Sequence, residues 1–358
     1  MKIFKYLASG IVLGIIFSIS NYIIVAQEGP DAKIEPSVKT AVIKNLLENL
    51  NSAYVFEDVA KKMEADLNAR VSKGEYKSVE SSREFAQKLT EHLQLVSNDK
   101  HLRVRFSPAM IPVRTDVRQP TAEEIAENAR YQRSTNFGFE RVERLAGNVG
   151  YIELRGFFSP VLGKETVEAA MTLVSNTDAL IIDLRRNGGG DPAMVALICS
   201  YFFGDQKVHL NDLYWRQGDR TDEFWTDPKV SGKKYTGKDV YILTSSRTFS
   251  GAEEFSYNLK NLKRATIVGE TTGGGAHPGT SFRLSDHFSA FIPLGRAISP
   301  VTKTNWEGTG VKPDIEIKKE EALKKAYGMA LEKSLAKQTD ENAKAALKRL
   351  IEENKAAN

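Results

Sequence analysis

A strand, a tight turn and a helix follow one another in the middle of this chain, and no other feature constrains the fold as strongly. Asp239-Val-Tyr-Ile-Leu243 is a short apolar run typical of a buried strand. Beyond it, Phe255, Leu259 and Leu262 recur at helical spacing. Ser250-Gly251 stands between the two patterns. The sequence therefore predicts a strand–turn–helix unit with Ser250 at the start of the helix.

Ser250 at a helix start allows two interpretations. Free backbone N–H groups and the positive end of the helix dipole favour a developing anion there, and acyl-transfer chemistry places its nucleophile in such a position. Alternatively, Ser250 or Thr248 simply caps the helix, with the glutamates that follow forming a capping box. This stretch alone leaves both interpretations open.

Apolar strands alternate with helical patterns from residue 148 onward. Strands are expected at Val149–Leu154 and Ala179–Leu184, and helices at Thr166–Val174 and Pro192–Phe203. Such alternation predicts an α/β fold built on a mostly parallel sheet with both faces covered. An antiparallel hairpin at Thr280–Arg283 and Ser289–Pro293 is expected beside the sheet.

Three special loops follow predicted strands of this sheet: Asn187–Gly190, the Ser250-Gly251 turn, and Gly273–Gly275. In open α/β sheets, ligands bind at the edge formed by the carboxyl ends of the strands. The first glycine cluster has neither the Gly-x-Gly-x-x-Gly spacing nor a Gly-Lys-Ser/Thr ending, which argues against a nucleotide site. The convergence of the three loops favours a functional role for Ser250.

The expected domain organisation follows from shifts in these patterns. Residues 1–26 carry two lysines and then an almost wholly apolar run, which predicts a signal peptide or, if uncleaved, a membrane anchor. The remaining divisions are a linker at 27–37, a helical domain at 38–106, a connecting region at 107–148, the α/β core at 149–318 and a solvated helical tail at 319–358. His101 stands where the helical domain passes into a strand.

Charge and cysteine content exclude several function classes. The formal net charge is +4, and removing Lys2 and Lys5 with the signal segment lowers it to +2. Basic and acidic residues are interspersed, so no nucleic-acid-binding stripe is predicted. Cys199 is the only cysteine and lies in an apolar run, so an internal disulfide is impossible and a buried core position is expected.

Three motifs together resemble the S41 family of serine peptidases, which includes C-terminal processing proteases, tricorn-type proteases and interphotoreceptor retinoid-binding protein. They are Leu184-Arg-Arg-Asn-Gly-Gly-Gly190, Thr248-Phe-Ser-Gly-Ala-Glu253 and Gly269-Glu-Thr-Thr-Gly-Gly-Gly275, in this order. The resemblance spans about residues 35–317. It implies a crotonase/Clp protease-like core with a small N-terminal helical domain.

The resemblance also implies roles for individual residues. Ser250 matches the nucleophile of the family's Thr-x-Ser-x-x-Glu turn. The Gly251 amide would then provide one oxyanion-hole donor, and the Gly188-Gly189 amides another. The chain would be an exported hydrolase, periplasmic or extracellular, that acts on a peptide or protein substrate.

One departure from the processing proteases concerns the general base. Their catalytic lysine aligns with Gly275, and the region 107–148 is too short for their PDZ domain. The tricorn-like branch instead uses Ser with His and Glu, and this chain offers His101 and Glu307 in similar contexts. His277, on the loop after Gly275, is the competing base and ranks below His101 on motif context.

The remaining expectations concern ligands. The five histidines are scattered without ligand spacing, so neither a metal nor an organic cofactor is predicted. The missing lysine and PDZ domain keep a second function open, in which the same fold is a non-catalytic binding module for a hydrophobic ligand. The sequence leaves the oligomeric state undetermined, and stable membrane insertion is not expected once the signal segment is removed.

Overall fold

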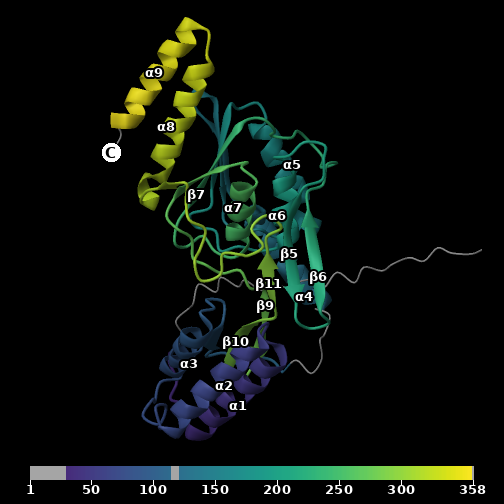
Figure 1. Ribbon diagram of the computed structural model, residues 1–358, viewed down its shortest axis with the longest axis vertical. Coiled ribbons are helices and arrows are strands. Elements are labelled where there is room, and N and C mark those ends of the chain that lie inside the picture. Colours follow the sequence, from purple (N-terminus) through teal and green to yellow (C-terminus); the bar gives the residue numbers. More distant parts are fainter. Residues whose placement is uncertain (1–29, 114–120, 357–358) are drawn as a thin grey trace, which may run out of the picture.

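The computed structural model describes residues 30–113 and 121–356 (Figure 1). The predicted signal peptide at 1–26 lies outside these residues. The helices in chain order are α1 (Pro36–Ala53), α2 (Glu57–Ser72), α3 (Ser82–Ser97), α4 (Ala122–Ser134), α5 (Pro160–Val174), α6 (Pro192–Ser200), α7 (Gly251–Asn261), α8 (Lys319–Lys337) and α9 (Glu341–Ala356). The strands are β1 (Arg103–Phe106), β2 (Phe139–Leu145), β3 (Val149–Leu154), β4 (Ala179–Asp183), β5 (His209–Trp215), β6 (Arg220–Trp225), β7 (Asp239–Thr244), β8 (Thr266–Gly269), β9 (Gly279–Arg283), β10 (Phe288–Pro293), β11 (Gly295–Ile298) and β12 (Ile315–Glu316).

A six-stranded sheet forms the centre of the molecule, in the order β12-β8-β7-β4-β3-β2. All neighbouring strands run parallel except β2, which pairs antiparallel with β3. Every residue of β4 is buried, because helices cover both faces of a parallel sheet and its central strands are apolar on both sides. The predicted α/β class with a mostly parallel sheet is confirmed. Cys199 is a buried free thiol in the core, also as expected.

Helix α8 covers one face of this sheet, so the expectation of a solvated C-terminal tail is wrong. Ala322, Ala326, Ala330 and Leu331 of α8 are fully buried against β4 and β7. Alanines four residues apart lie on one helix face, and their small side chains let the helix approach the sheet closely. Many lysines and glutamates surround these alanines in the sequence, so the residue pattern of α8 did not predict a buried face. Helix α9 folds back along α8 (Figure 1).

The N-terminal helices pack on a second sheet, which β1, β10 and β9 form. Strand β1 pairs antiparallel with β10, which pairs in turn with β9, so the predicted hairpin is confirmed and gains a third strand. Leu50, Phe85 and Leu93 of the helices share one apolar cluster with Phe288 and Ile292 of β10. This pairing carries the segment just before β1, including His101, to the α/β core.

A third sheet, in the order β11-β5-β6, was not predicted. Strand β6 reads Arg-Thr-Asp-Glu-Phe-Trp, and most of its positions are polar or partly exposed. Its pairing with β5 depends on residues that only the folded chain brings together. Strand β2 was likewise missed in the connecting region, where only a helix near Thr121–Ala129 was expected and is found as α4.

The buried stripe of α8 gives a test of the fold. We expect Ala326→Glu to lower the free energy of unfolding by about 3 kcal/mol or more, because it places an unpaired carboxylate against the sheet. Ala345→Glu, at an exposed position of α9, is the matched control and should change it little. Urea unfolding measures both. Equal, small effects would mean that α8 does not pack on the sheet.

Candidate functional site

Three loops meet at the carboxyl ends of β4, β7 and β8, as the sequence predicted. The three strands run parallel in adjacent positions, so their carboxyl ends lie at one edge of the sheet. Backbone hydrogen bonds then join the loops directly. The N–H of Phe249 donates to the carbonyl of Asn187 at 3.0 Å, and the N–H of Gly273 donates to the carbonyl of Thr248 at 2.9 Å. The turn that contains Ser250 is therefore held between its two neighbours.

Ser250 adopts a backbone conformation that few residues other than glycine take. Its φ is 54° and its ψ is −121°, at the position immediately before α7. Conformations of this kind cost about 1–3 kcal/mol and persist where the surrounding structure enforces them, which is common at functional sites. The strained backbone marks Ser250, between β7 and α7, as a candidate functional residue.

Gly189 lies against this turn and leaves no room for a side chain. Its φ is +104°, and a Cβ placed on it would lie 2.7 Å from the Ser250 Cβ and 2.6 Å from the Gly251 nitrogen. The positive φ and the lack of space for a Cβ both require glycine at this position. The close approach of the two turns brings backbone N–H groups near Ser250.

The N–H groups expected to form an oxyanion hole differ in availability. Gly251 is the first residue of α7, where N–H groups have no partner within the helix. The Gly189 N–H donates to Oδ1 of Asn187 at 2.8 Å, so in this structure that amide is already engaged. The Gly188 N–H has no hydrogen-bond partner among the described residues. Of the predicted glycine pair, Gly188 is therefore the better candidate for the second donor.

The buried carboxylate of Glu253 ties the Ser250 turn to the loop after β8. Oε2 accepts the N–H groups of Ser250 (2.9 Å) and Gly275 (2.8 Å). Oε1 accepts the N–H of Gly274 (2.6 Å) and the hydroxyl of Thr272 (2.5 Å). The capping interpretation thus holds for Glu253, which caps the backbone of Ser250 and of a second loop at once.

Burial works against the charge on Glu253. Its side chain is wholly enclosed, and burial raises its pKa to about 7, opposed by the hydrogen bonds from Thr272 and the loop N–H groups. Four donors fill the acceptor sites of an ionised carboxylate, whereas a protonated acid would bring a donor of its own. We therefore regard the ionised form as the one that holds the loops.

His101 lies beside the Ser250 turn, although it comes from the N-terminal part of the chain. Its ring centroid is 4.6 Å from that of Phe249, the residue before Ser250, and 5.9 Å from that of Phe291. Burial, opposed by the charge of Asp99, lowers the pKa of His101 to about 4. Its Nδ1 is buried without a hydrogen-bond partner among the described residues. The structure shows no hydrogen bond between this ring and Ser250 within the same residues.

Gly275 leaves no room for a side chain beside His101. A Cβ on Gly275 would lie 2.6 Å from Cε1 of His101 and would also overlap the Phe249 ring. The two rings occupy the space above this residue. A lysine at position 275 and His101 in its present place therefore exclude each other sterically.

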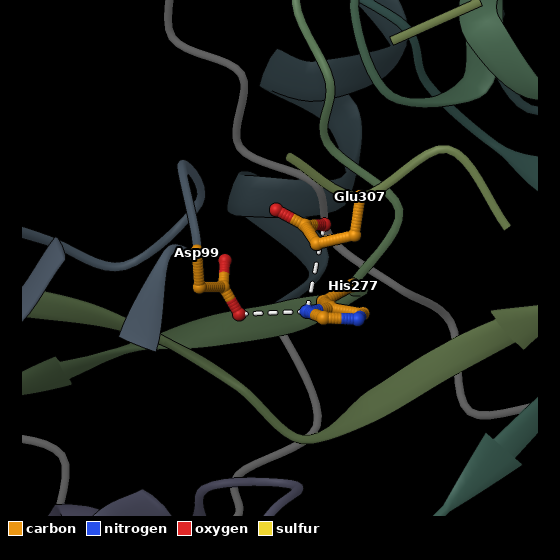
Figure 2. Close-up of side chains that lie close together, drawn as sticks. All are labelled: Asp99, His277 and Glu307. Carbon is orange, nitrogen blue, oxygen red and sulfur yellow. Dashed lines mark hydrogen bonds and ion pairs between the residues drawn. The ribbon is translucent and has the colours of Figure 1, made fainter. Parts of the chain in front are cut away.

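Glu307 does not contact the His101 ring through any hydrogen bond that the structure describes. Its Oε1 accepts the N–H of Lys100 at 3.2 Å, and its Oε2 accepts the N–H of Ala276 at 2.5 Å. Oε2 also lies 3.4 Å from Nδ1 of His277 (Figure 2). Burial and the charge of Asp99 raise the pKa of Glu307 to about 7. Glu307 thus holds the backbone on either side of the site.

His277 and Asp99 form a buried pair that sequence reasoning missed. Nδ1 of His277 donates to Oδ2 of Asp99 at 2.7 Å (Figure 2), and the two side chains are 6% and 0% exposed. The residues lie 178 positions apart, so no local sequence pattern predicts the contact. The only signal was the position of Asp99 two residues before His101.

The candidate ligand atoms of Asp99, His277 and Glu307 all lie within 4.8 Å of one another, so these groups could hold a metal ion. Hydrogen bonds already occupy them: Asp99 Oδ2 accepts from His277 and from the Tyr54 hydroxyl, and both Glu307 oxygens accept backbone N–H groups. A metal would have to replace the proton between His277 and Asp99. The arrangement fits a protonated network better than a metal centre, and the sequence-based expectation of no metal stays a prediction.

Glu253 and its neighbour Glu254 provide a matched pair for testing the loop anchor. Glu253→Gln should lower the free energy of unfolding by about 2 kcal/mol or more at pH 7. The amide NH2 group of glutamine is a donor, so it cannot accept the hydrogen bonds that one carboxylate oxygen of Glu253 accepts. Burial raises the pKa of Glu254 to about 8, so this acid is largely neutral and Glu254→Gln should be tolerated. Urea unfolding compares the two. Equal losses would contradict the anchoring role of Glu253.

Comparison with known proteins places the chain in a family. Residues 148–317 match the family described as Peptidase family S41, and residues 37–139 match the N-terminal domain of Peptidase_S41 in eukaryotic IRBP. The chain is 30% identical over 185 residues to carboxyl-terminal-processing peptidase 2 of Arabidopsis thaliana, covering 48% of this chain and 32% of that protein. It spans about a third of the length of the curated relatives it first matches.

Solved structures show the same fold at low sequence identity. A protein from Parabacteroides merdae superimposes with a TM-score of 0.57 at 18% identity, over 82% of this chain and 96% of the other. A mutant of CPAF gives a TM-score of 0.54 at 13% identity, over 88% and 98%. The predicted crotonase/Clp protease-like core, in the form that S41 peptidases have, is confirmed by this likeness. With adjoining matches across both its N-terminal and its α/β parts, the chain belongs to peptidase family S41.

Proposed function

We propose that this chain is a serine peptidase in which Ser250 is the nucleophile and His101 the general base. The observation that carries the proposal is the place of the His101 ring. It packs against Phe249, the residue before the strained serine, in space that Gly275 leaves free. Membership of family S41 supports the reaction class, and a peptide or protein is the expected substrate.

In this proposal the Ser250 hydroxyl attacks the carbonyl carbon of a peptide bond while His101 takes its proton. The N–H groups of Gly251 and Gly188 would stabilise the negative charge that develops on the carbonyl oxygen. His101 then protonates the leaving amine, which leaves an acyl group on Ser250. Water, deprotonated by the same histidine, hydrolyses this ester. We expect the hydrogen bond between Ser250 and His101 to form with substrate bound, as catalytic hydrogen bonds often do.

Glu307 has a supporting role in this scheme. Because it binds the N–H groups of Lys100 and Ala276, it fixes the backbone next to His101 without touching the ring. The charge that favours a protonated His101 imidazole, the form His101 takes during the reaction, is that of Asp99.

We further propose that the protein is exported. The support is the sequence of residues 1–26, where two lysines precede a long apolar run. In the part of the chain that the structure describes, no helix combines the length and the apolar character needed to cross a membrane.

Labelling with a serine-directed fluorophosphonate tests the nucleophile. We expect stoichiometric labelling of Ser250 in the wild type and none in Ser250→Ala, detected by peptide mass spectrometry. Ser246→Ala is the matched control, because Ser246 lies exposed in the same turn and should not affect labelling. A folded wild type that neither labels nor hydrolyses any member of a peptide library, yet binds a lipophilic ligand, would favour the binding module instead.

The environment of His101 predicts an unusual pH dependence. A general base must be neutral, and burial lowers the pKa of His101 from 6.5 to about 4. The rate of labelling at Ser250 should therefore rise with pH through a midpoint near 4 and be almost fully developed at pH 6.5. Circular dichroism at each pH checks that the protein stays folded. A midpoint at 6.5 in folded protein would contradict a buried base.

A further inference from the structure

Asp99 is the point at which the segment that carries His101 is attached to the α/β core. Its carboxylate is completely buried. Oδ1 accepts the N–H of His101 at 3.0 Å, while Oδ2 accepts the hydroxyl of Tyr54 at 3.1 Å and Nδ1–H of His277 at 2.7 Å. One carboxylate therefore joins the backbone of the proposed base to the loop that follows Gly275.

Two further bonds fix the same segment from the core side. The Lys100 N–H donates to Glu307, and its ammonium group donates to the carbonyl of Gly273 at 2.7 Å. These bonds hold Lys100, the residue before His101. The contact from His277 to Asp99, drawn in Figure 2, reaches the carboxylate whose other oxygen accepts the His101 N–H.

We propose that His277 is a positioning residue for His101, which acts by holding the Asp99 carboxylate against the His101 backbone. The inference rests on the proposed function, since it assigns His277 a part in that reaction. We assign the base to His101 because its ring packs against Phe249, the residue before Ser250, whereas the His277 ring packs against Phe56. His277, the competing candidate for the base, is thus assigned the role of holding His101 in place.

The physical reason lies in the cost of a buried charge. Burial would raise the pKa of Asp99, yet the hydrogen bond and charge of His277 hold it below its ordinary value. Without that donor, the carboxylate would be left with two neutral donors, the Tyr54 hydroxyl and the His101 N–H. It would then take up a proton or turn toward water. Either change loosens the His101 backbone, and a shift of about 1 Å in a catalytic group can cost about 100-fold in rate.

Two substitutions at His277 separate positioning from packing. Asn places an amide nitrogen where Nδ1 of histidine lies, so His277→Asn can still donate to Asp99, whereas His277→Leu cannot. His92→Leu is the control, because His92 of α3 makes a comparable 2.7 Å bond to Tyr76 and belongs to none of the loops of the site. All three are compared with wild type by kcat and KM on a cleaved peptide and by the labelling rate of Ser250.

We expect His277→Leu to lower kcat and the labelling rate at least 10-fold while KM changes less than about twofold, because the substrate contacts remain. His277→Asn should recover most of this loss, and His92→Leu should behave as wild type. A kcat for folded His277→Leu within twofold of wild type would overturn the proposal. So would a His277→Asn variant as impaired as His277→Leu while both remain folded.

A second readout does not depend on activity. In Ser250→Ala protein, the ¹⁵N resonances of the His101 ring and amide hydrogen exchange at residues 99–101 should change with His277→Leu and be restored by His277→Asn. If these signals respond while wild type never labels at Ser250, the positioning role stands and the peptidase proposal fails. If wild type labels and the signals do not respond, the positioning role alone fails.

Discussion

The site depends on one buried carboxylate that accepts four hydrogen bonds. Glu253 holds the Ser250 N–H from one side and the N–H groups of Gly274 and Gly275 from the other. Glu253 lies in the first turn of α7, so the helix that follows Ser250 also anchors the loop that contains Gly274 and Gly275. The strained φ of Ser250 persists because this anchor and the close contact with Gly189 fix the turn from two directions.

The proposed base reaches this turn by a longer route. The helices of the N-terminal part pack on β10, and His101 lies two residues before β1, the partner of β10. The position of the base therefore depends on a tertiary pairing between residues nearly two hundred apart, and on the cluster of Asp99, His277 and Glu307 that fastens the segment. The proposed nucleophile and the proposed base come from different parts of the chain, so the site exists only when both parts are folded and docked.

How much the sequence could predict follows from the range of each interaction. The strands β4 and β7, the three loops and the Ser250 turn were predicted because apolar runs and glycine clusters are local signals. The role of Glu253 was seen only as a helix cap, since its bonds to Gly274 and Gly275 cross between loops. The His277–Asp99 pair was not predicted, because its two residues lie 178 positions apart in the sequence. Helix α8 was misjudged because its charges outnumber the alanines that face the sheet.

The central claim is that Ser250 and His101 form one reactive pair. A crystal structure of the protein after reaction with a fluorophosphonate tests it most directly. We expect a phosphonyl group on Oγ of Ser250, its oxygen within hydrogen-bond distance of the Gly251 and Gly188 N–H groups, and Nε2 of His101 within hydrogen-bond distance of the same Oγ. A modified Ser250 with His277 at that position, or with His101 beyond hydrogen-bond distance of Oγ, would contradict the proposed pair.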